Sequence, residues 1–590
     1  MRLALFSWFV LFLMSTSQAQ FKKPSKSEPP DAIYVNGNVY TGLFVAAKTG
    51  GPLSPAESGW KLDGLEPYRV EALAVRGDRV VAIGSNPQAK ALADKHTLVV
   101  DLKGRFVMPG FNDAHLHLAS GGFEKLNVDL AGVKSLQEMQ ERIAARAKSS
   151  APGEWIQGRG WDHTTWPGKK LPSREDLDEV TGKHPAIFVR VDGHIAVANS
   201  AALAVAGITK GSPDPAGGKI DRDEQGEPTG IVRESAKDEV MAKIPPPTPS
   251  QRRRAVELAL QDAASHGITS VQDNSDWEDF LTYEDLEREG KLTLRICEWL
   301  PFNAPLTTLD QHRSHHEQRD LMLHTGMLKG FMDGSLGSRT AAMLKPYSDD
   351  PNNTGLPQYK QSELNQMAEE RVAARYQMGF HAIGDAGTEL ALNAFESAER
   401  YAREHDITGV APDAEIREFR FRVEHAQVVS PPQIKRFRDL KVIASMQPNH
   451  LLTDMNWAMD RIGPERARTS YAWKSFLDAG VMLAFGTDYP VEPITPFRGL
   501  YAAVTRKNES GTKEYFPEEK ISIQQALTAY TSGAAFAEFA EGDKGTLAPG
   551  MLADFVVLDR DITRAAPAEI LNTKVLRTVV GGKTVFAAEQ

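Results

Sequence analysis

The sequence is short of cysteine and of positive charge. It has one cysteine, Cys297, in 590 residues, so no intrachain disulfide can contribute to its stability. Cys297 lies in an apolar run, and we interpret it as a buried core residue. There are 68 Lys and Arg residues against 78 Asp and Glu, a net charge of −10. This balance predicts no nucleic-acid partner.

A long hydrophobic run is also missing. The apolar stretch that follows Met1 and Arg2 ends near Met14, short of the ~20 residues that a membrane span requires. The small-residue segment 17–19 comes next, and no cysteine lies there to carry a lipid. These features predict a signal peptide, residues 1–19, cleaved after Ala19, and a secreted or periplasmic protein with no stable membrane span. An uncleaved anchor is the alternative.

The two ends of the chain have the same sequence pattern. Residues 31–104 and 541–590 contain short β-rich segments separated by Gly, Asn, Asp and Pro. We expect both to contribute to one small β-sandwich domain, so that the chain ends meet around a central module.

Residues 105–540 alternate short β-rich runs with helical periods, which is typical of βα units in a parallel sheet. The eight runs are 106–117, 268–273, 292–300, 327–333, 377–383, 419–425, 442–447 and 481–488. Expected helices include 361–376, 388–404 and 465–479. Eight alternations predict an α/β protein with a closed (β/α)8 barrel of the TIM type rather than an open sheet.

One connection is too long for a simple crossover. Residues of about 120–249 must form an inserted lobe after the first barrel strand. The Trp, Gly and Pro content of this lobe indicates a lid, and the proline-rich segment 245–249 predicts a rigid link back to the barrel.

Potential metal ligands lie at the ends of several predicted strands. His115 and His117 are two residues apart, so a strand directs both imidazoles to one face. His381, His425 and Asp488 end the fifth, sixth and eighth runs. The carboxyl ends of barrel strands converge on one mouth. Nitrogen and oxygen ligands without a thiolate suit Zn²⁺ best, with Mn²⁺, Fe²⁺ or Co²⁺ as alternatives.

Lys329 lies on the fourth run and is expected to face the same mouth. A lysine on a barrel strand is unusual for packing. The alternative is a side chain that extends to solvent or pairs with Asp333.

This set of residues resembles the ligands of the amidohydrolase superfamily, and the resemblance extends from about residue 31 to the end. Several strings are similar to the branch called amidohydrolase family 3, which is YtcJ-like and includes N-substituted formamide deformylase. They are residues 329–341 (KGFMDGSLGSRTA), 381–385 (HAIGD), 422–427 (RVEHAQ) and 486–491 (GTDYPV), with 158–162 (GRGWD) and 192–199 (DGHIAVAN) in the lobe. Ile195 and Val197 depart from the branch and concern the shape of the substrate pocket.

The resemblance implies a hydrolase that cleaves an amide-type C–N bond of a small molecule with a metal-activated hydroxide. It implies that Lys329 is carboxylated and bridges two metal ions, most simply Zn²⁺. The residues that would bind the ions are His115, His117 and Asp488 for one, and His381 and His425 for the other. Asp488 would be the catalytic residue, taking the proton of the hydroxide and returning it to the leaving nitrogen.

Five further residues are expected to contact the substrate, although each also has a purely structural interpretation. Trp161, Asp162 and His194 belong to the lobe. Arg339 follows the fourth run, and His450 follows the seventh.

Other functions remain open from the sequence. A mononuclear deaminase would use His115, His117, His381 and Asp488, but such enzymes usually add a glutamate near the fifth-strand histidine, where this chain has Asp385. The dinuclear site could also hydrolyse esters or lactones. A metal-free binding protein would have lost ligands, whereas all six positions hold a competent residue. The oligomeric state is open, and a homodimer is one arrangement that the sequence allows.

Overall fold

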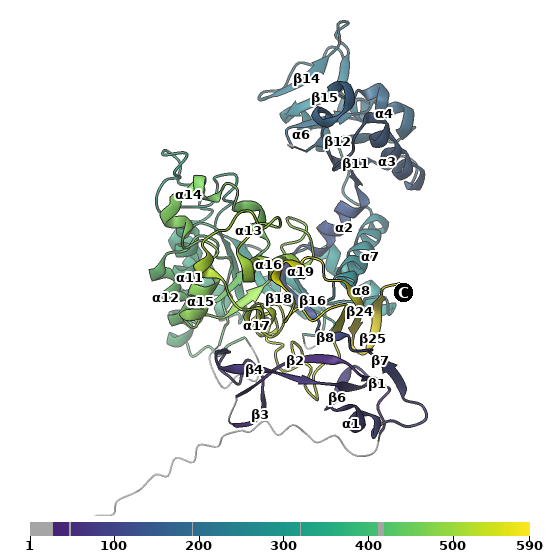
Figure 1. Ribbon diagram of the computed structural model, residues 1–590. Coiled ribbons are helices and arrows are strands. Elements are labelled where there is room, and N and C mark those ends of the chain that lie inside the picture. The colour runs from purple at the N-terminus through teal and green to yellow at the C-terminus, as the bar shows by residue number, and fades with distance from the viewer. Residues whose placement is uncertain (1–27, 47–48, 192, 319, 411–417, 590) are drawn as a thin grey trace, which may run out of the picture.

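A computed structural model describes residues 28–46, 49–191, 193–318, 320–410 and 418–589. The expected signal peptide lies outside these residues and stays a prediction. In the described parts of the chain, no helix is both long and apolar enough to cross a membrane. The molecule has three parts, with a barrel between a terminal β domain and a separate lobe (Figure 1).

Eight parallel strands form the barrel, in the order β22-β21-β20-β19-β18-β17-β16-β9. They are β9 (Phe111–Leu116), β16 (Ile268–Asp273), β17 (Arg295–Pro301), β18 (Leu323–Phe331), β19 (Met378–Ala382), β20 (Arg422–His425), β21 (Ile443–Met446) and β22 (Leu483–Phe485). The amide of Asp488, just beyond β22, donates to the carbonyl of His115 on β9 at 2.7 Å. The sheet therefore curls into a nearly closed barrel, and the predicted fold is confirmed.

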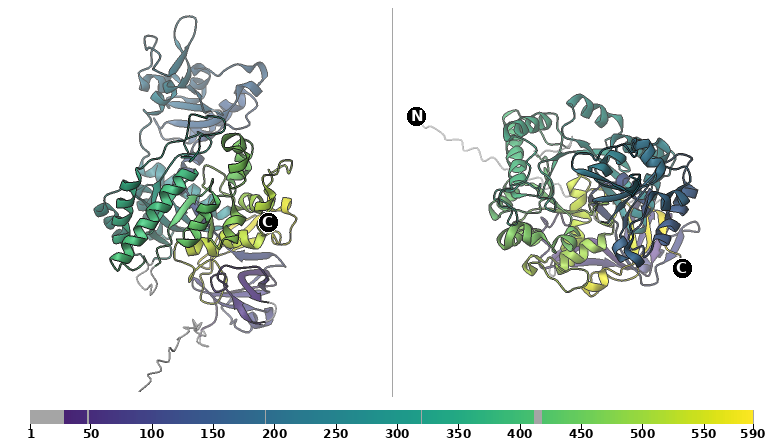
Figure 2. Two further views of the ribbon diagram at one scale, coloured as in Figure 1. Left: turned by 90° about the vertical axis from the view of Figure 1, so that its left-hand side faces the viewer. Right: turned by 90° about the horizontal axis from the view of Figure 1, so that it is seen from above.

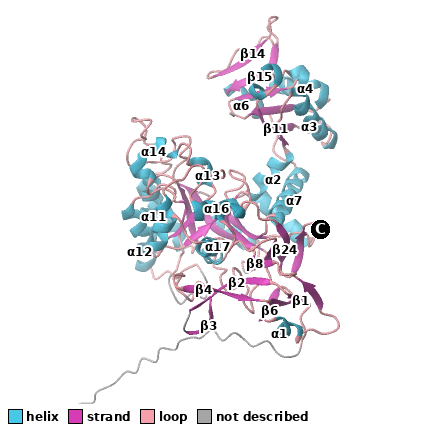
Figure 3. Ribbon diagram, viewed as in Figure 1, coloured by secondary structure: helices cyan, strands magenta, loops and turns pink. Residues whose placement is uncertain are grey.

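Helices cover the outside of the barrel, as Figure 3 shows. Among them are α7 (Pro249–Ser265), α8 (Trp277–Arg288), α9 (Leu306–His315), α10 (Gln361–Ala373), α11 (Asp385–Glu404), α12 (Pro431–Asp439) and α16 (Pro496–Thr505). The expected helix 465–479 is instead two helices, α14 (Ala458–Ala467) and α15 (Trp473–Asp478). Between them Ser470 forms a β-bridge with Val428, which interrupts the helical hydrogen bonds.

The first half of the predicted barrel run 106–117 belongs to the terminal domain. β8 (Phe106–Pro109) pairs with β2 (Asn38–Ala46) and β23 (Phe555–Leu558), so the barrel begins only at β9. The break falls at Gly110, where an added Cβ would lie 2.2 Å from the side chain of Thr269. Only glycine fits this crossing between the two sheets.

The terminal domain is a sandwich built from both chain ends. One sheet has the order β6-β5-β1-β7, and the other has β25-β24-β23-β8-β2-β3, with β4 on β2. Their other strands are β1 (Ala32–Val35), β3 (Thr49–Leu53), β4 (Leu65–Val70), β5 (Ala72–Arg76), β6 (Arg79–Gly84), β7 (Leu98–Asp101), β24 (Val575–Val580) and β25 (Lys583–Ala587). Leu73 and Val75 of one sheet pack in a buried cluster with Phe555 and Val579 of the other.

The inserted lobe leaves the barrel through α2 (Leu118–Leu126) and returns at α7. Its strands, in sheet order, are β10 (Val128–Asp129), β11 (Ile156–Trp161), β12 (Ala186–Arg190), β13 (Ile195–Ala198), β15 (Pro228–Glu234) and β14 (Gly218–Arg222). Its helices are α3 (Leu136–Ser149), α4 (Arg174–Thr181), α5 (Ser200–Ala206) and α6 (Ser235–Met241). In both side views the lobe lies at one end of the molecule and the terminal domain at the other (Figures 1 and 2).

Candidate active site

The predicted metal ligands meet at the carboxyl ends of the barrel strands. A cavity of about 330 Å³ there is lined by all six of them, together with Phe331, Gln427, His450 and Trp457 among others. The six are His115, His117, Lys329, His381, His425 and Asp488. Barrel geometry therefore brings together residues that are more than 370 positions apart in the chain.

His115, His117 and Asp488 form one group of ligand types, with one ligand atom of each lying within 4.8 Å of the others. Oδ1 of Asp488 is 3.3 Å from Nε2 of His117 and 3.6 Å from Nε2 of His115. The Nδ1 atoms face acceptors, 2.8 Å from Glu424 for His115 and 2.9 Å from the carbonyl of Asn274 for His117. With the proton on Nδ1, Nε2 of each neutral imidazole offers its lone pair beside the carboxylate, an arrangement that suits a cation.

Burial keeps the buried imidazoles neutral. It lowers the pKa of His115 to about 4, with a contribution from Lys329. It lowers the pKa of His381 to about 3 and that of His425 well below its usual value. A histidine must be neutral to bind a metal, so the electrostatics of the mouth fit that role.

A second group consists of His425, His450 and Asp488. Nε2 of His450 lies 3.0 Å from Oδ2 of Asp488. Burial opposes its charge, but the hydrogen bond with Asp488 raises the pKa of His450 to about 9. Burial also opposes the charge of Asp488, yet the imidazoles of His117 and His450 hold the pKa of that carboxyl well below its usual range. His450 therefore contacts the expected catalytic residue.

Lys329 lies beside the first of these groups. Its Nζ is 3.1 Å from Nε2 of His115 and 5.1 Å from the centre of the Trp299 ring. Asp333, the alternative partner of Lys329, instead accepts main-chain hydrogen bonds from Ala342, Ile383 and Gly384. Burial lowers the pKa of Lys329 to about 8.

His381 contacts other groups in this structure. Its Nε2 is 3.1 Å from the carbonyl of Gly334 and 3.6 Å from Asp333. Its ring lies beside that of His425, with 4.5 Å between ring centres. The two histidines thus adjoin on neighbouring strands, β19 and β20.

Two functional residues were not predicted from the sequence. Arg422 and Glu424 lie on β20, both fully buried inside the barrel, and Nε of Arg422 donates to Oε1 of Glu424 at 2.8 Å. Burial opposes the charge of Glu424, but Arg422 holds the pKa of this carboxyl near 2. The signal was present in the string RVEHAQ, because an arginine and a glutamate two apart on a buried strand must share one face and need partners there.

Two of the predicted ligands have strained backbone. His425 has a φ of 73° and Asp488 a φ of 57°, in the left-handed region that residues other than glycine rarely adopt. Each such residue costs on the order of 1–3 kcal/mol, and such costs concentrate at functional sites.

The lobe residues do not reach the cavity in this structure. Trp161 is fully buried in the lobe, where its Nε1 donates to the carbonyl of Phe188 at 2.9 Å. Asp162 pairs with Arg190 at 2.6 Å. His194 is exposed and lies 3.0 Å from Glu234. Substrate contact by these three stays a prediction, and it requires the lobe to move.

Arg339 is also outside the cavity. Its guanidinium makes two hydrogen bonds, of 3.0 and 2.8 Å, with the carboxylate of Asp349. Of the five expected substrate contacts, the structure brings only His450 to the mouth.

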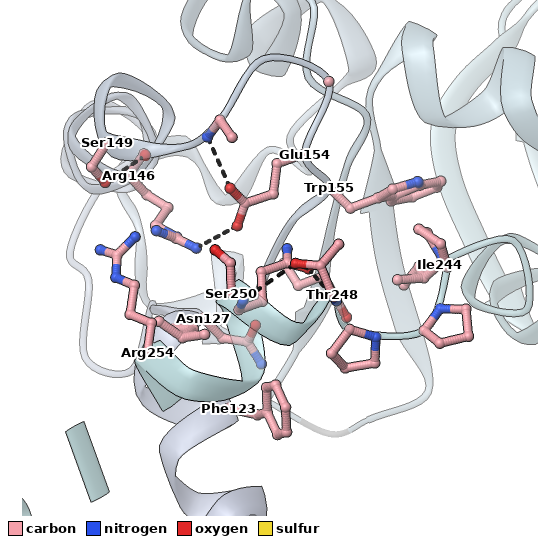
Figure 4. Close-up of a pocket in the computed structure, with 18 of the residues that line it drawn as sticks. Phe123, Asn127, Arg146, Ser149, Glu154, Trp155, Ile244, Thr248, Ser250 and Arg254 are labelled. Atoms are coloured by element: carbon pink, nitrogen blue, oxygen red, sulfur yellow. Dashed lines mark hydrogen bonds and ion pairs between the residues drawn. The ribbon is translucent and has the colours of Figure 1, made fainter. Parts of the chain in front are cut away.

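A larger cavity, of about 700 Å³, lies where the lobe joins the barrel (Figure 4). Arg146 and Glu154 face one another across part of it at 3.0 Å, and Trp155 and Phe123 line other parts. None of the residues that line this cavity is a predicted metal ligand, whereas all six predicted ligands line the smaller cavity.

The barrel and the residues at its mouth define the class of this protein, a metal-dependent hydrolase. The chain belongs to the amidohydrolase family, whose model matches residues 98–586. The resemblance drawn from the motifs is confirmed.

Similar proteins come from distant organisms. Protein LONG AFTER FAR-RED 3 of Arabidopsis thaliana is 34% identical over 528 residues, covering 88% of each chain. N-substituted formamide deformylase of Arthrobacter pascens is 27% identical over 528 residues, covering 87% of this chain and 94% of the deformylase. The crystal structure of an uncharacterized metal-dependent hydrolase from Pyrococcus furiosus has a TM-score of 0.71 and 32% identity, covering 90% of this chain and all of that one.

Proposed function

We propose that this amidohydrolase cleaves the C–N bond of a small acylated amine with the help of two divalent metal ions, most simply Zn²⁺. The observation that carries the proposal is the convergence of the neutral His115 imidazole and the Asp488 carboxylate at a mouth lined by four further ligand residues. The similarity to an N-substituted formamide deformylase supports an amide-type substrate.

The chain offers two sets of ligands. His115, His117 and Asp488 would hold one ion, and His381 and His425 the other. When bound, the ions supply an activated water at neutral pH and polarise the substrate carbonyl.

Asp488 is suited to the proton transfers. Its depressed pKa keeps the carboxylate ionised at neutral pH, so it can accept a proton from the attacking water. His450 fixes the orientation of this carboxylate through Oδ2. The same carboxyl can then deliver the proton to the leaving nitrogen, which departs as a neutral amine.

Lys329 would bridge the two sets after carboxylation. Because burial lowers its pKa, part of the population has a neutral amine at neutral pH. That amine can attack CO₂ and lose a proton, giving a carbamate whose single negative charge is shared by two oxygens. The change replaces a cation with an anion beside His115, where a second cation would otherwise be repelled.

The deaminase alternative has less support. Asp385, which stands where such enzymes place a glutamate, accepts a hydrogen bond from the main chain of Leu344 at 2.7 Å. It is not among the residues that line the cavity.

A substrate panel tests the proposal. Zinc-loaded protein should be assayed against N-formyl amines, N-acyl amino acids, cyclic amides, aminopurines and lactones. We expect turnover of amides, with release of a free amine. Release of ammonia from aminopurines, with no amide turned over, would instead establish the deaminase.

A further inference from the structure

A second cluster of residues that can bind a metal lies at the opposite end of the barrel from the active site, an end that we call the floor of the barrel. It comprises Cys297 on β17, His324 on β18 and Glu538, which directly follows α18 (Ser532–Ala537). One ligand atom of each lies within 4.8 Å of the others. His324 is five residues before Lys329 on the same strand, roughly 16 Å away.

The register of the strands creates this proximity. Cys297 and His324 are direct partners in the parallel ladder between β17 and β18. Gly326 leaves space for the sulfur, because a Cβ at this position would lie 2.4 Å from Sγ of Cys297. The thiol therefore occupies the interior of the barrel, where a larger neighbour would displace it.

Two polar atoms of the cluster lack a hydrogen-bond partner although they are buried. They are Nδ1 of His324 and Oε2 of Glu538, whose side chain is only 2% exposed. Buried polar atoms without a partner are costly and uncommon. Neither atom bonds to the nearby thiol, so both remain available to a group bound beside Cys297.

The other oxygen of Glu538 has its partners. Oε1 accepts from Asn112 at 2.6 Å and from Lys544 at 2.9 Å. The ammonium of Lys544 also donates to the hydroxyl of Ser270. These bonds hold the carboxylate in place and leave Oε2 available to another positively charged group.

We propose that Cys297, His324 and Glu538 bind a structural divalent ion, preferably Zn²⁺, at the floor of the barrel. Thiolate, imidazole and carboxylate are the ligands that Zn²⁺ takes in proteins. The thiol loses its proton on binding, so each ion that enters releases one proton. Thiolate and carboxylate together balance the two charges of the ion. The site would fasten β17, β18 and the segment after α18 to one another.

The charge of Lys544 should affect the metal affinity of this site and not that of the active site. Its ammonium keeps one positive charge beside the ion, which weakens binding. A Lys544→Met variant should therefore bind the floor ion more tightly than the wild type, whereas it should leave the affinity of the active site unchanged.

Cobalt substitution is the decisive experiment. Metal-free full-length protein should be loaded with Co²⁺ and its near-ultraviolet spectrum recorded. A thiolate bound to Co²⁺ gives a charge-transfer band, and Cys297 is the only cysteine in the chain. The active-site residues include no sulfur, so such a band reports only the floor site. We expect the band, and we expect added Zn²⁺ to remove it.

Two variants complete the design. Cys297→Ser should abolish the band, lower the metal content by one ion per chain and preserve activity. Lys329→Ala should keep the band while losing activity, which separates this site from the proposed function. The proposal is overturned if wild-type protein saturated with Co²⁺ shows no thiolate band, or if the band persists in Cys297→Ser. The wild-type spectrum decides the matter even if the serine variant does not fold.

Discussion

Oε2 of Glu424 lies 2.8 Å from Nδ1 of His115, buried inside the barrel. The contact is the last step of a polar chain along the barrel interior. Gln272 accepts from Arg422, and Arg422 donates to Glu424. This chain fixes the His115 ring with Nε2 toward Asp488, so the geometry of the proposed metal site depends on residues that do not touch the metal.

Replacing Glu424 with glutamine should weaken metal binding about 10- to 100-fold, the usual effect of losing such a partner. The neutral amide makes the His115 ring less basic and leaves Arg422 without its anionic partner. Competition with a chelator would measure the affinity. Glu298→Gln is a matched control, since Glu298 is equally buried, on barrel strand β17, and does not line the cavity. Equal affinities in the two variants would contradict the role of Glu424.

Asp488→Asn should lower kcat by about 10²- to 10⁴-fold, because the amide cannot accept a proton. Asparagine keeps the size of the side chain and one oxygen. Steady-state kinetics at matched metal content would test this. Near-normal turnover by a fully loaded variant would rule out Asp488 as the proton acceptor.

The reconstitution of metal-free protein should depend on bicarbonate and pH. With a pKa of about 8, Lys329 is neutral in roughly a tenth of the molecules at pH 7 and about nine-tenths at pH 9. Only the neutral amine reacts with CO₂. At a concentration of dissolved CO₂ that is held constant by raising bicarbonate with pH, reconstitution should therefore become faster as pH rises between these values. Reconstitution followed by activity and metal content, with Lys329→Ala as the control, measures the effect. Indifference to bicarbonate at both pH values would argue against carboxylation.

The lobe should move toward the mouth when substrate binds. His194 is exposed in the lobe and does not line the cavity, so His194→Ala should spare metal content and change the selectivity among substrates. His96→Ala, at an exposed position in the terminal domain, is the control. Small-angle scattering should show a smaller radius of gyration with a bound inhibitor. An unchanged radius, with wild-type selectivity in His194→Ala, would contradict the lid interpretation.

The barrel could be predicted because its strands are buried on both faces. Such strands appear as short apolar runs, and the run 268–273 coincides with β16. The run 106–117 was wrongly predicted as one barrel strand. It contains both β8 and β9, which are equally buried, and only the crossing at Gly110 separates them. An apolar run does not reveal which sheet it joins.

The site could be predicted only in part, for a related reason. His115, His381 and His425 lie at strand ends, where topology alone brings them to one mouth. The position of Trp161 depends on how the lobe folds. The sequence could not show that its indole is buried in the core of the lobe, with its N–H bonded to the carbonyl of Phe188, rather than facing the cavity. The contact of His450 with Asp488 likewise depends on the loop after β21, whose path no local pattern specifies.

Metal removal tests the central claim most directly. The protein should be treated with a chelator, its metal content measured, and amide turnover recorded before and after Zn²⁺ is restored. We predict that turnover falls with metal content and returns when active-site metal is restored. Full amide turnover by protein shown to hold no metal would contradict the assignment of this mouth as a metal-dependent hydrolytic site.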